Sequence, residues 1–328
     1  MDFSKRTGAN RYAFSYLYVM KHYGIGLLFA VFCAISAFAG EPVPRLRVGS
    51  SSGIFGPVGN WTYETFAEAK KAGIDAVEIS ASKLFLDKEM TDESRIEARC
   101  RQLKRDLKRA GIEIWSVHMP FGKEIDLSQT DEAIRRKSVE LHRRLLRFCR
   151  ILSPRIVLFH PSWYLGHGER DERIACLVRS AGELLPDVRR IGAEMVVENM
   201  LGHELVRDEN YERPLGRTVE EVLHIMSLLP REVNAAVDTN HIDNPELLIR
   251  ALGTRVKTIH VSDGDGRNEC HDLPWQGRGD NDWAAVLKAL YEDARYRGVF
   301  MYEVKKAEFS ELKDCYDKMY EQYVRTVR

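Results

Sequence analysis

The sequence lacks the features that mark several protein classes. Its 49 lysines and arginines equal its 49 aspartates and glutamates, so no excess of positive charge favours a nucleic-acid partner. No two cysteines have the CxxC spacing of a metal or redox site, and no linker, low-complexity tract or GxGxxG motif is present. What remains is an ordinary globular composition, 44% hydrophobic and 30% charged over 328 residues. That length fills one large domain or two modest ones.

The longest apolar run lies near the N-terminus. Residues 25–39 form an uncharged stretch of about 15 residues, preceded by Lys21 and ending in Ala-Phe-Ala. The run is shorter than the roughly 20 residues that a membrane-spanning helix needs, and it has the plan of a secretory signal peptide with an A-x-A cleavage site. We therefore expect residues 1–39 to be a signal peptide with an upstream extension, the natural start being Met20, and residues 40–328 to be the mature domain. The alternative is an uncleaved N-terminal anchor.

Cleavage at this position changes the charge of the protein. The mature chain would carry 45 basic and 48 acidic residues, a net charge of −3. We expect a mildly acidic, exported protein in a bacterial periplasm, with no stable membrane insertion and no nucleic-acid partner. Its five remaining cysteines are widely spaced and odd in number, so we expect buried or free thiols rather than a disulfide framework.

Short apolar and β-branched runs alternate with longer segments of helical period along the mature chain. Eight runs predict strands, at Leu46–Ser50, Ala76–Ser80, Ile112–His118, Ile156–His160, Glu194–Glu198, Val233–Asp238, Val256–Val261 and Val299–Glu303. Helical patterns lie between them, at Trp61–Ala72, Ser94–Ala110, Asp131–Leu152, Asp171–Arg190, Thr218–Leu229, Pro245–Leu252 and Trp283–Arg295. Several of these helices are followed by a glycine that can end them, namely Gly73, Gly111, Gly192 and Gly298.

This alternation predicts the fold class. Strand and helix repeated eight times over about 289 residues is typical of an α/β protein with a single (β/α)8 TIM barrel. A doubly wound open sheet is the competing fold, but it usually has fewer strands and a glycine-rich loop after the first one. The last helical segment, residues 309–327, would pack either under the barrel or against a second copy of the chain. The second arrangement would form a homo-oligomer.

Six of the eight predicted strands end on or beside a side chain that can bind a metal or transfer a proton. They are His118, His160, Glu198, Asp238, His260 and Glu303. The carboxyl ends of the strands of a parallel barrel meet at one face, so these residues should converge on one pocket. Each alone has a structural alternative, such as a hydrogen-bonded histidine or a carboxylate that caps the next helix. Glu198 and Glu303 end apolar strands, however, and buried carboxylates are rare unless they are paired or bind a metal.

The residue types point to one kind of chemistry. Two glutamates, one aspartate and one histidine offer oxygen and nitrogen ligands that suit one divalent ion, such as Mn²⁺, Co²⁺, Mg²⁺ or Zn²⁺. One ion with carboxylates on opposite sides of a substrate suits proton transfer beside a carbonyl. The metal polarises the oxygen while the carboxylates remove and return the proton.

Five segments also carry a family resemblance: Gly73–Glu78, Val197–Asn199, Val237–His241, Ile259–Asp263 and Leu273–Gly279. They resemble the sugar phosphate isomerase/epimerase superfamily, the xylose isomerase-like TIM barrels that also include ketose 3-epimerases and endonuclease IV. The resemblance covers essentially the whole mature chain. It is specific for the superfamily but not for a substrate.

The resemblance implies roles for individual residues. The four metal ligands would be Glu198, Asp238, His260 and Glu303. In the epimerase branch, Glu198 and Glu303 would also be the two catalytic acid–base groups. The candidate substrate-binding residues are His118, His160, Glu204, His241, Arg267 and His271. Among these, His241 would contact a substrate oxygen or a further metal.

The leading hypothesis is an exported, metal-dependent sugar isomerase or epimerase that acts by proton transfer next to a carbonyl of a free sugar, glycoside or keto-sugar. A lyase or hydratase would use the same scaffold, and a non-catalytic sugar-binding protein is a further alternative. The histidines also resemble the three-zinc arrangement of endonuclease IV, a phosphodiesterase. Against that reading stand the export signal, the acidic mature chain and Glu269-Cys270-His271, where that family has Asp-x-His.

Overall fold

Eight parallel strands form the centre of the protein. The computed structural model describes residues 43–86, 92–277 and 279–327. The strands are β1 (Arg47–Ser51), β2 (Ala76–Ser80), β3 (Glu113–His118), β4 (Ile156–Phe159), β5 (Glu194–Glu198), β6 (Asn234–Asp238), β7 (Val256–Val261) and β8 (Val299–Tyr302). Each pairs with the next in parallel, and β8 pairs with β1, so the barrel is closed. The predicted TIM barrel is therefore confirmed.

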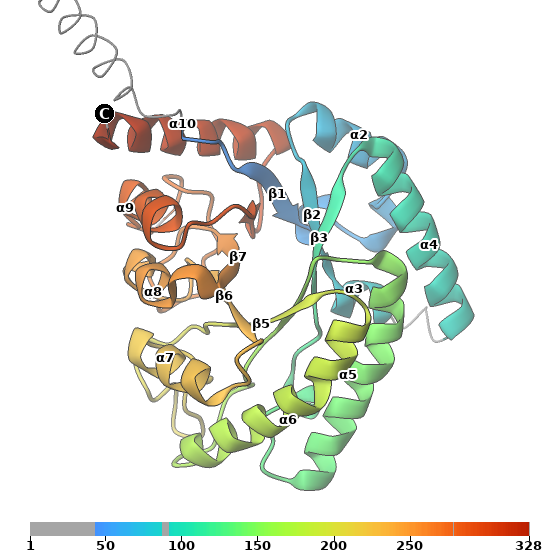
Figure 1. The fold of residues 1–328 in the computed structure, drawn as a ribbon, viewed down its shortest axis with the longest axis vertical. Helices are drawn as coiled ribbons and strands as arrows, with labels where there is room; N and C mark the ends of the chain where they lie inside the picture. Colours follow the sequence, from blue (N-terminus) through green and yellow to red (C-terminus); the bar gives the residue numbers. More distant parts are fainter. Residues whose placement is uncertain (1–42, 87–91, 278, 328) are drawn as a thin grey trace, which may run out of the picture. The chain divides into compact units, whose positions relative to one another are not determined.

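Helices surround the strands (Figure 1). The helices are α2 (Tyr63–Lys71), α3 (Ala81–Phe85), α4 (Glu93–Ala110), α5 (Glu132–Leu152), α6 (Arg170–Arg190), α7 (Val219–Leu228), α8 (Pro245–Leu252), α9 (Trp283–Lys288) and α10 (Phe309–Val327). Four 3₁₀ turns, η1 (Ser52–Phe55), η2 (Val58–Asn60), η3 (Lys123–Ile125) and η4 (Gly253–Arg255), and one π turn, η5 (Ala289–Asp293), complete the elements. Within the described ranges, no helix is both long and apolar enough to cross a membrane. The expected signal peptide, residues 1–39, lies outside those ranges.

The helix ends follow simple capping chemistry, with one difference from expectation. Gly111 ends α4 in the left-handed region at φ 77°, as predicted for a glycine at this position. Before β8, however, the left-handed residue is Arg295, at φ 50°, and Gly298 does not end a helix. A Cβ atom at Gly298 would collide with the ring of Tyr296, so close packing explains this glycine.

The five cysteines that the structure describes form no disulfide with one another. Cys100, Cys149, Cys176 and Cys315 are buried free thiols, and Cys270 is a partly exposed one. The expectation of buried or free thiols is confirmed for these five residues. The packed core supplies the stability that disulfides provide in many smaller domains.

Apolar side chains fill the part of the barrel interior away from the carboxyl ends of the strands. Ile156, Leu158, Val196 and Ala236 form one buried cluster, and the half-buried Trp115 packs against it. The indole Nε1 of Trp115 donates a hydrogen bond to Thr258 Oγ1 at 3.2 Å. This packed floor leaves the polar strand ends at the opposite, carboxyl end of the barrel, where TIM barrels carry their active sites.

Two register shifts determine which polar residues become neighbours. Between β6 and β7 the pairing leaves out Lys257 of β7, so that Asp238 lies beside His260. Between β2 and β3 it leaves out Trp115 of β3, so that Glu78 lies beside Ser116. A bulge of this kind redirects the side chains that follow it. Both irregularities therefore shape the mouth of the barrel.

Candidate metal centre

Four side chains at the mouth of the barrel form a central group. Glu198, Asp238, His260 and Glu303 each direct one potential ligand atom to the same place, with all four atoms within 4.8 Å of one another. His260 Nδ1 lies 2.8 Å from Glu198 Oε1 and 2.8 Å from Glu303 Oε2. The structure thus brings together the four residues that the sequence nominated as metal ligands.

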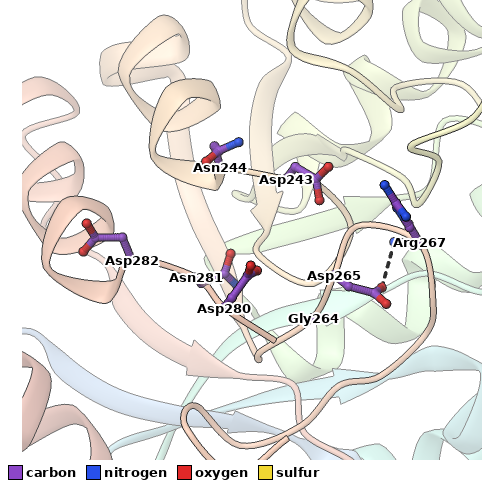
Figure 2. Close-up of a pocket in the computed structure, with 8 residues that line it drawn as sticks. All are labelled: Asp243, Asn244, Gly264, Asp265, Arg267, Asp280, Asn281 and Asp282. Atoms are coloured by element: carbon purple, nitrogen blue, oxygen red, sulfur yellow. Dashed lines mark hydrogen bonds between the residues drawn. The ribbon is translucent and has the colours of Figure 1, made fainter. Parts of the chain in front are cut away.

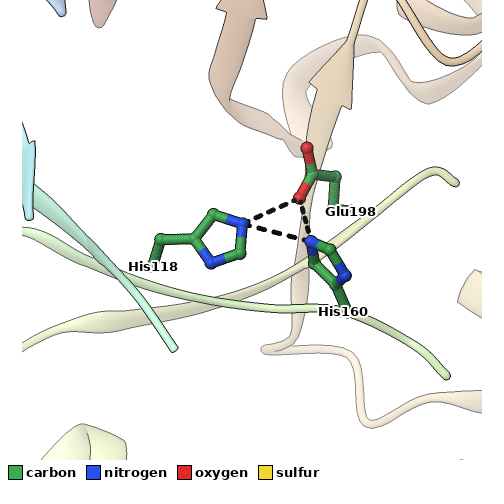
Figure 3. A group of neighbouring side chains, drawn as sticks. All are labelled: His118, His160 and Glu198. Atoms are coloured by element: carbon green, nitrogen blue, oxygen red, sulfur yellow. Dashed lines mark hydrogen bonds and ion pairs between the residues drawn. The ribbon is translucent and has the colours of Figure 1, made fainter. Parts of the chain in front are cut away.

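A second group adjoins the central one on the side of β3 and β4. Figure 3 shows the imidazoles of His118 and His160 pointing at the carboxylate of Glu198. Their Nε2 atoms lie 3.1 Å apart and 3.5 and 3.3 Å from Glu198 Oε2. Phe159 pairs with Val197 in the sheet, so the next residues, His160 and Glu198, are neighbours as well. We call these three residues the strand flank.

A third group lies on the opposite side. Asp238, His241 and His271 place ligand atoms within 4.8 Å of one another. The carboxylate of Glu269 joins them, since its Oε2 lies 3.2 Å from His241 Nε2 and 2.9 Å from His271 Nε2. In the sequence, Glu269 stands where the resemblance to endonuclease IV implies an aspartate. We call these four residues the loop flank.

The three groups share carboxylates. Glu198 belongs to the strand flank and to the central group, and Asp238 belongs to the central group and to the loop flank. A carboxylate has two oxygens and can bind two cations at once. Glu198 and Asp238 would each serve two of the groups, and the residues would hold up to three divalent ions. The histidines expected to bind substrate lie among these potential ligands.

Glu78 is a functional candidate that the sequence analysis missed. It is buried on β2, and its Oε1 lies 3.0 Å from His260 Nε2, while its Oε2 accepts a hydrogen bond from Ser116 Oγ at 2.7 Å. Histidines that bind metals usually direct their second nitrogen at such a carboxylate, which fixes the tautomer and the ring orientation. The available signal was a charged residue inside an otherwise apolar strand, AVEIS.

The electrostatics of the cluster favour positive charge. Burial lowers the pKa of His118, but contact with Glu198 and the charges of Glu78, Glu198 and Glu303 outweigh it and raise the pKa to about 9. For His241, burial is likewise outweighed by the charges of Asp238 and Glu269, so its pKa rises to about 10. Among the histidines of the cluster, burial outweighs the neighbouring charges only at His160, whose pKa is lowered. The carboxylates therefore attract cations, either as protons on imidazoles or as metal ions.

The residues fit a divalent metal. Glu198 Oε2 and Asp238 Oδ2 are buried and accept no well-formed hydrogen bond from any residue that the structure describes. Burying a carboxylate oxygen without a well-formed hydrogen bond is costly, and a cation removes that cost. Burial raises the pKa of Asp238 to about 6, with the charges of Glu198 and Glu303 acting in the same direction and that of His241 opposing them. Carboxylate oxygens with imidazole nitrogens suit Zn²⁺, Mn²⁺ or Co²⁺.

A cavity of about 320 Å³ opens onto the centre. Its ionisable lining residues are His118, His160, His241, His271, Glu269 and Glu303. Its apolar and aromatic lining includes Phe121, Trp163, Tyr164, Met200 and Leu201. The ring of Phe121 stacks on that of His160, with centroids 3.9 Å apart. An aromatic wall therefore stands directly over the strand flank.

Two predicted substrate-binding residues lie elsewhere. Glu204 is exposed on the loop after β5 and does not line this cavity. Arg267 lines a separate cavity of about 430 Å³, together with Asp243, Asp265, Asp280 and Asp282 (Figure 2). Both residues sit in long loops, whose paths the sequence pattern does not predict.

Comparison with known proteins places these features in a family. Residues 66–320 match the family model described as xylose isomerase-like TIM barrel. Among curated relatives, "Probable endonuclease 4" of Thermotoga sp. strain RQ2 is 28% identical over 179 residues, and that of Thermotoga petrophila is 37% identical over 181 residues. Each match covers 49% of this chain and 58% of the relative, so the chain spans little more than half the length of these relatives.

Solved structures show the same fold. A D-tagatose 3-epimerase-like protein superimposes with a TM-score of 0.69 at 21% identity, covering 86% of this chain and 100% of that protein. The 3-keto-D-glucoside 4-epimerase of E. coli gives a TM-score of 0.62 at 15% identity, with coverages of 86% and 100%. The barrel is thus like that of sugar epimerases and isomerases. With the family model spanning most of its length, the chain belongs to the xylose isomerase-like TIM barrel family.

Proposed function

We propose that the protein is a hydrolase with several divalent metal ions that cleaves a phosphodiester. The observation that carries the proposal is the pair of shared carboxylates, Glu198 and Asp238, which link three groups of potential ligands. Bound ions would polarise a phosphoryl oxygen and acidify a water molecule, which is the chemistry that adjacent metal ions supply to phosphoester cleavage. Similarity to relatives named endonuclease 4 supports the same class of reaction.

The residues of the chain hold the reacting groups. In the reaction, a water oxygen forms a bond to phosphorus, one P–O ester bond breaks, and a proton from the water passes to the leaving alcohol. Glu303 borders the cavity and keeps 28% of its side chain exposed, so its carboxylate can hold that proton in transit. Phe121 and Trp163 cover the apolar face of a ring on the substrate and exclude water from it.

The burial of Glu198 favours hydrolysis over the isomerase mechanism. An isomerase with two acid–base carboxylates needs both to reach the substrate carbon. Glu198 is only 1% exposed and is enclosed by the imidazoles of His118, His160 and His260. It is therefore placed as a ligand, whereas Glu303 is accessible. One accessible carboxylate is enough for a hydrolase.

A small phosphodiester fits better than duplex DNA. The described lining of the cavity contains neither lysine nor arginine, and the sequence has no excess of positive charge. Duplex binding usually requires many cationic contacts with phosphates. We therefore propose a small phosphodiester that carries a sugar or another ring.

The second candidate function is that of a metal-dependent sugar isomerase or epimerase. The central group and the accessible Glu303 favour it, because one metal ion and one base are enough to form an enolate from a keto-sugar. The likeness in fold to ketose epimerases supports this candidate. Deuterium incorporation from D₂O into ketoses, measured with Mn²⁺ present, would favour it over hydrolysis.

The proposed function has a direct test. Protein loaded with Mn²⁺ or Zn²⁺ should hydrolyse bis(p-nitrophenyl) phosphate, and elemental analysis should find more than one ion per chain. His118→Asn should remove one ion and most of the activity, whereas His224→Asn, at an exposed histidine on α7, should change neither. One ion per chain with no phosphodiesterase activity would reject the proposal.

Export remains part of the proposal. The apolar run and the A-x-A site support cleavage after residue 39 and a periplasmic location. Mass spectrometry of the protein purified from a bacterial host should find a mature N-terminus at residue 40. A periplasmic product that retains residues 20–39 would contradict cleavage.

A further inference from the structure

A second cavity adjoins the metal centre. It measures about 260 Å³, and its lining includes His118, Phe121, His271 and Glu303, which also line the first cavity. Phe121 is 45% exposed, with its ring centroid 5.6 Å from that of His118. The two cavities therefore border the metal centre from different sides and meet at Phe121. A substrate bound over the metals can extend into both.

The two cavities differ in charge. The first contains Trp163 and Tyr164, and its described lining residues include neither lysine nor arginine. The second contains Lys83 and Lys305, with the hydroxyl groups of Ser51 and Ser80. Glu78 and Glu303 also line it; Glu303 is one of the four central potential ligands and Glu78 contacts His260, so bound metal ions would offset their charge.

The two lysines are available for a ligand. Neither ammonium group forms an ion pair with a carboxylate of residues 43–86, 92–277 or 279–327. Lys305 Nζ donates a hydrogen bond to the backbone oxygen of Glu269, which holds the ammonium at the edge of the loop flank. Lys83 Nζ lies over Gly53, about 4.0 Å from where a Cβ would stand. Both positive charges therefore border one side of the metal centre.

We propose that the second cavity is a substrate subsite that binds an anionic group. The substrate is then a phosphodiester with two different ester groups, in which a ring packs on Phe121 and Trp163 while a carboxylate or phosphate on the other side binds Lys83 and Lys305. This inference rests on the proposed phosphodiester cleavage. It adds that one ester group of the substrate carries a ring and the other an anionic group. An anion between two ammonium groups and two hydroxyls is recognised by charge-assisted hydrogen bonds.

The test uses two phosphonates that differ only in charge. Isothermal titration of the Mn²⁺-loaded protein compares 3-phosphonopropionate with 3-phosphonopropanamide, in which a neutral amide replaces the carboxylate while the phosphonate is kept. The compound with the carboxylate should bind about fivefold more tightly, the size expected for an accessible ion pair. Lys83→Ala and the double variant with Lys305→Ala should lose the preference. Lys306→Ala, at an exposed lysine outside both cavities, should keep it.

The outcomes separate this inference from the proposed function. Equal affinity of the wild-type protein for the two phosphonates would overturn the anionic subsite, as would a preference that survives in the double variant. Failure of bis(p-nitrophenyl) phosphate hydrolysis would instead reject the proposed reaction, because the titration needs no turnover. Lys83 is exposed, and thermal unfolding of each variant verifies that the fold is intact.

Discussion

The two flanks of the metal centre are built differently. On the strand flank, His118 and His160 project from the ends of barrel strands, with 11% and 8% of their side chains exposed. On the loop flank, Glu269 comes from the loop after β7 and is 50% exposed. Residues in a strand ladder open only at a high free-energy cost, whereas an exposed loop opens easily. We therefore expect any metal sites around Glu198 to be rigid and a site on the loop flank to bind more weakly.

The largest effect should follow from Glu198→Gln. Glu198 belongs to both the strand flank and the central group, so the variant should lose ions from both. We expect phosphodiesterase activity to fall about a thousandfold, because bound metal ions supply several kcal/mol of transition-state stabilisation. Glu194→Gln, at an exposed glutamate in the same strand, is the control. Three ions retained in Glu198→Gln would contradict the shared ligand.

Glu269→Ala should have a smaller effect, confined to the loop flank. Elemental analysis should find one ion fewer, and activity should fall about a hundredfold, since one metal site rather than two is lost. Glu269→Asp keeps the carboxylate but shortens its reach, and should recover part of the occupancy. If Glu269→Ala lowers activity and ion content as much as Glu198→Gln does, the two flanks do not differ in the way proposed.

Glu78→Gln should weaken the central group without removing a ligand. The glutamine amide can donate to His260 Nε2 and so favour the wrong tautomer, and the affinity for metal should fall about tenfold to a hundredfold. Competition with a fluorescent chelator measures this affinity independently of activity. Ser116→Ala removes the hydrogen bond to Glu78 Oε2 and should also lower the affinity for metal, but by less. Unchanged affinity in Glu78→Gln would show that Glu78 only fills space.

The smallest effect concerns pH and the metal-free protein. The pKa of His118 rises from 6.5 to about 9 on folding, so its protonation stabilises the metal-free fold fully below pH 6.5 and ceases to do so as the pH rises through 9. The melting temperature in chelator should therefore fall by several degrees between pH 6.5 and 9.5. His118→Asn should flatten this dependence. The metal-loaded protein should show the opposite trend, because protons compete with metal for the imidazoles.

The sequence predicted most of the barrel but only part of the site. Three of the eight strands, including Ala76–Ser80 and Glu194–Glu198, have the predicted bounds, because apolar runs and helix-ending signals are local. The convergence of His118 and His160 with Glu198 followed from the rule that parallel strands end at one face. Glu204 and Arg267 did not join them, because loop paths depend on packing that no periodicity records.

By itself, the amino-acid sequence determined the eightfold alternation of strands and helices and the kinds of side chain at the strand ends. Tertiary structure alone decided their partners. The unpaired Lys257 of β7 places Asp238 beside His260, and the unpaired Trp115 of β3 places Glu78 beside Ser116. Side chains alternate between the two faces of a strand, so a shift of one residue exchanges neighbours, and a bulge is stabilised by contacts distant in sequence. The loop after β7 likewise brings Glu269 to two histidines only in the folded chain.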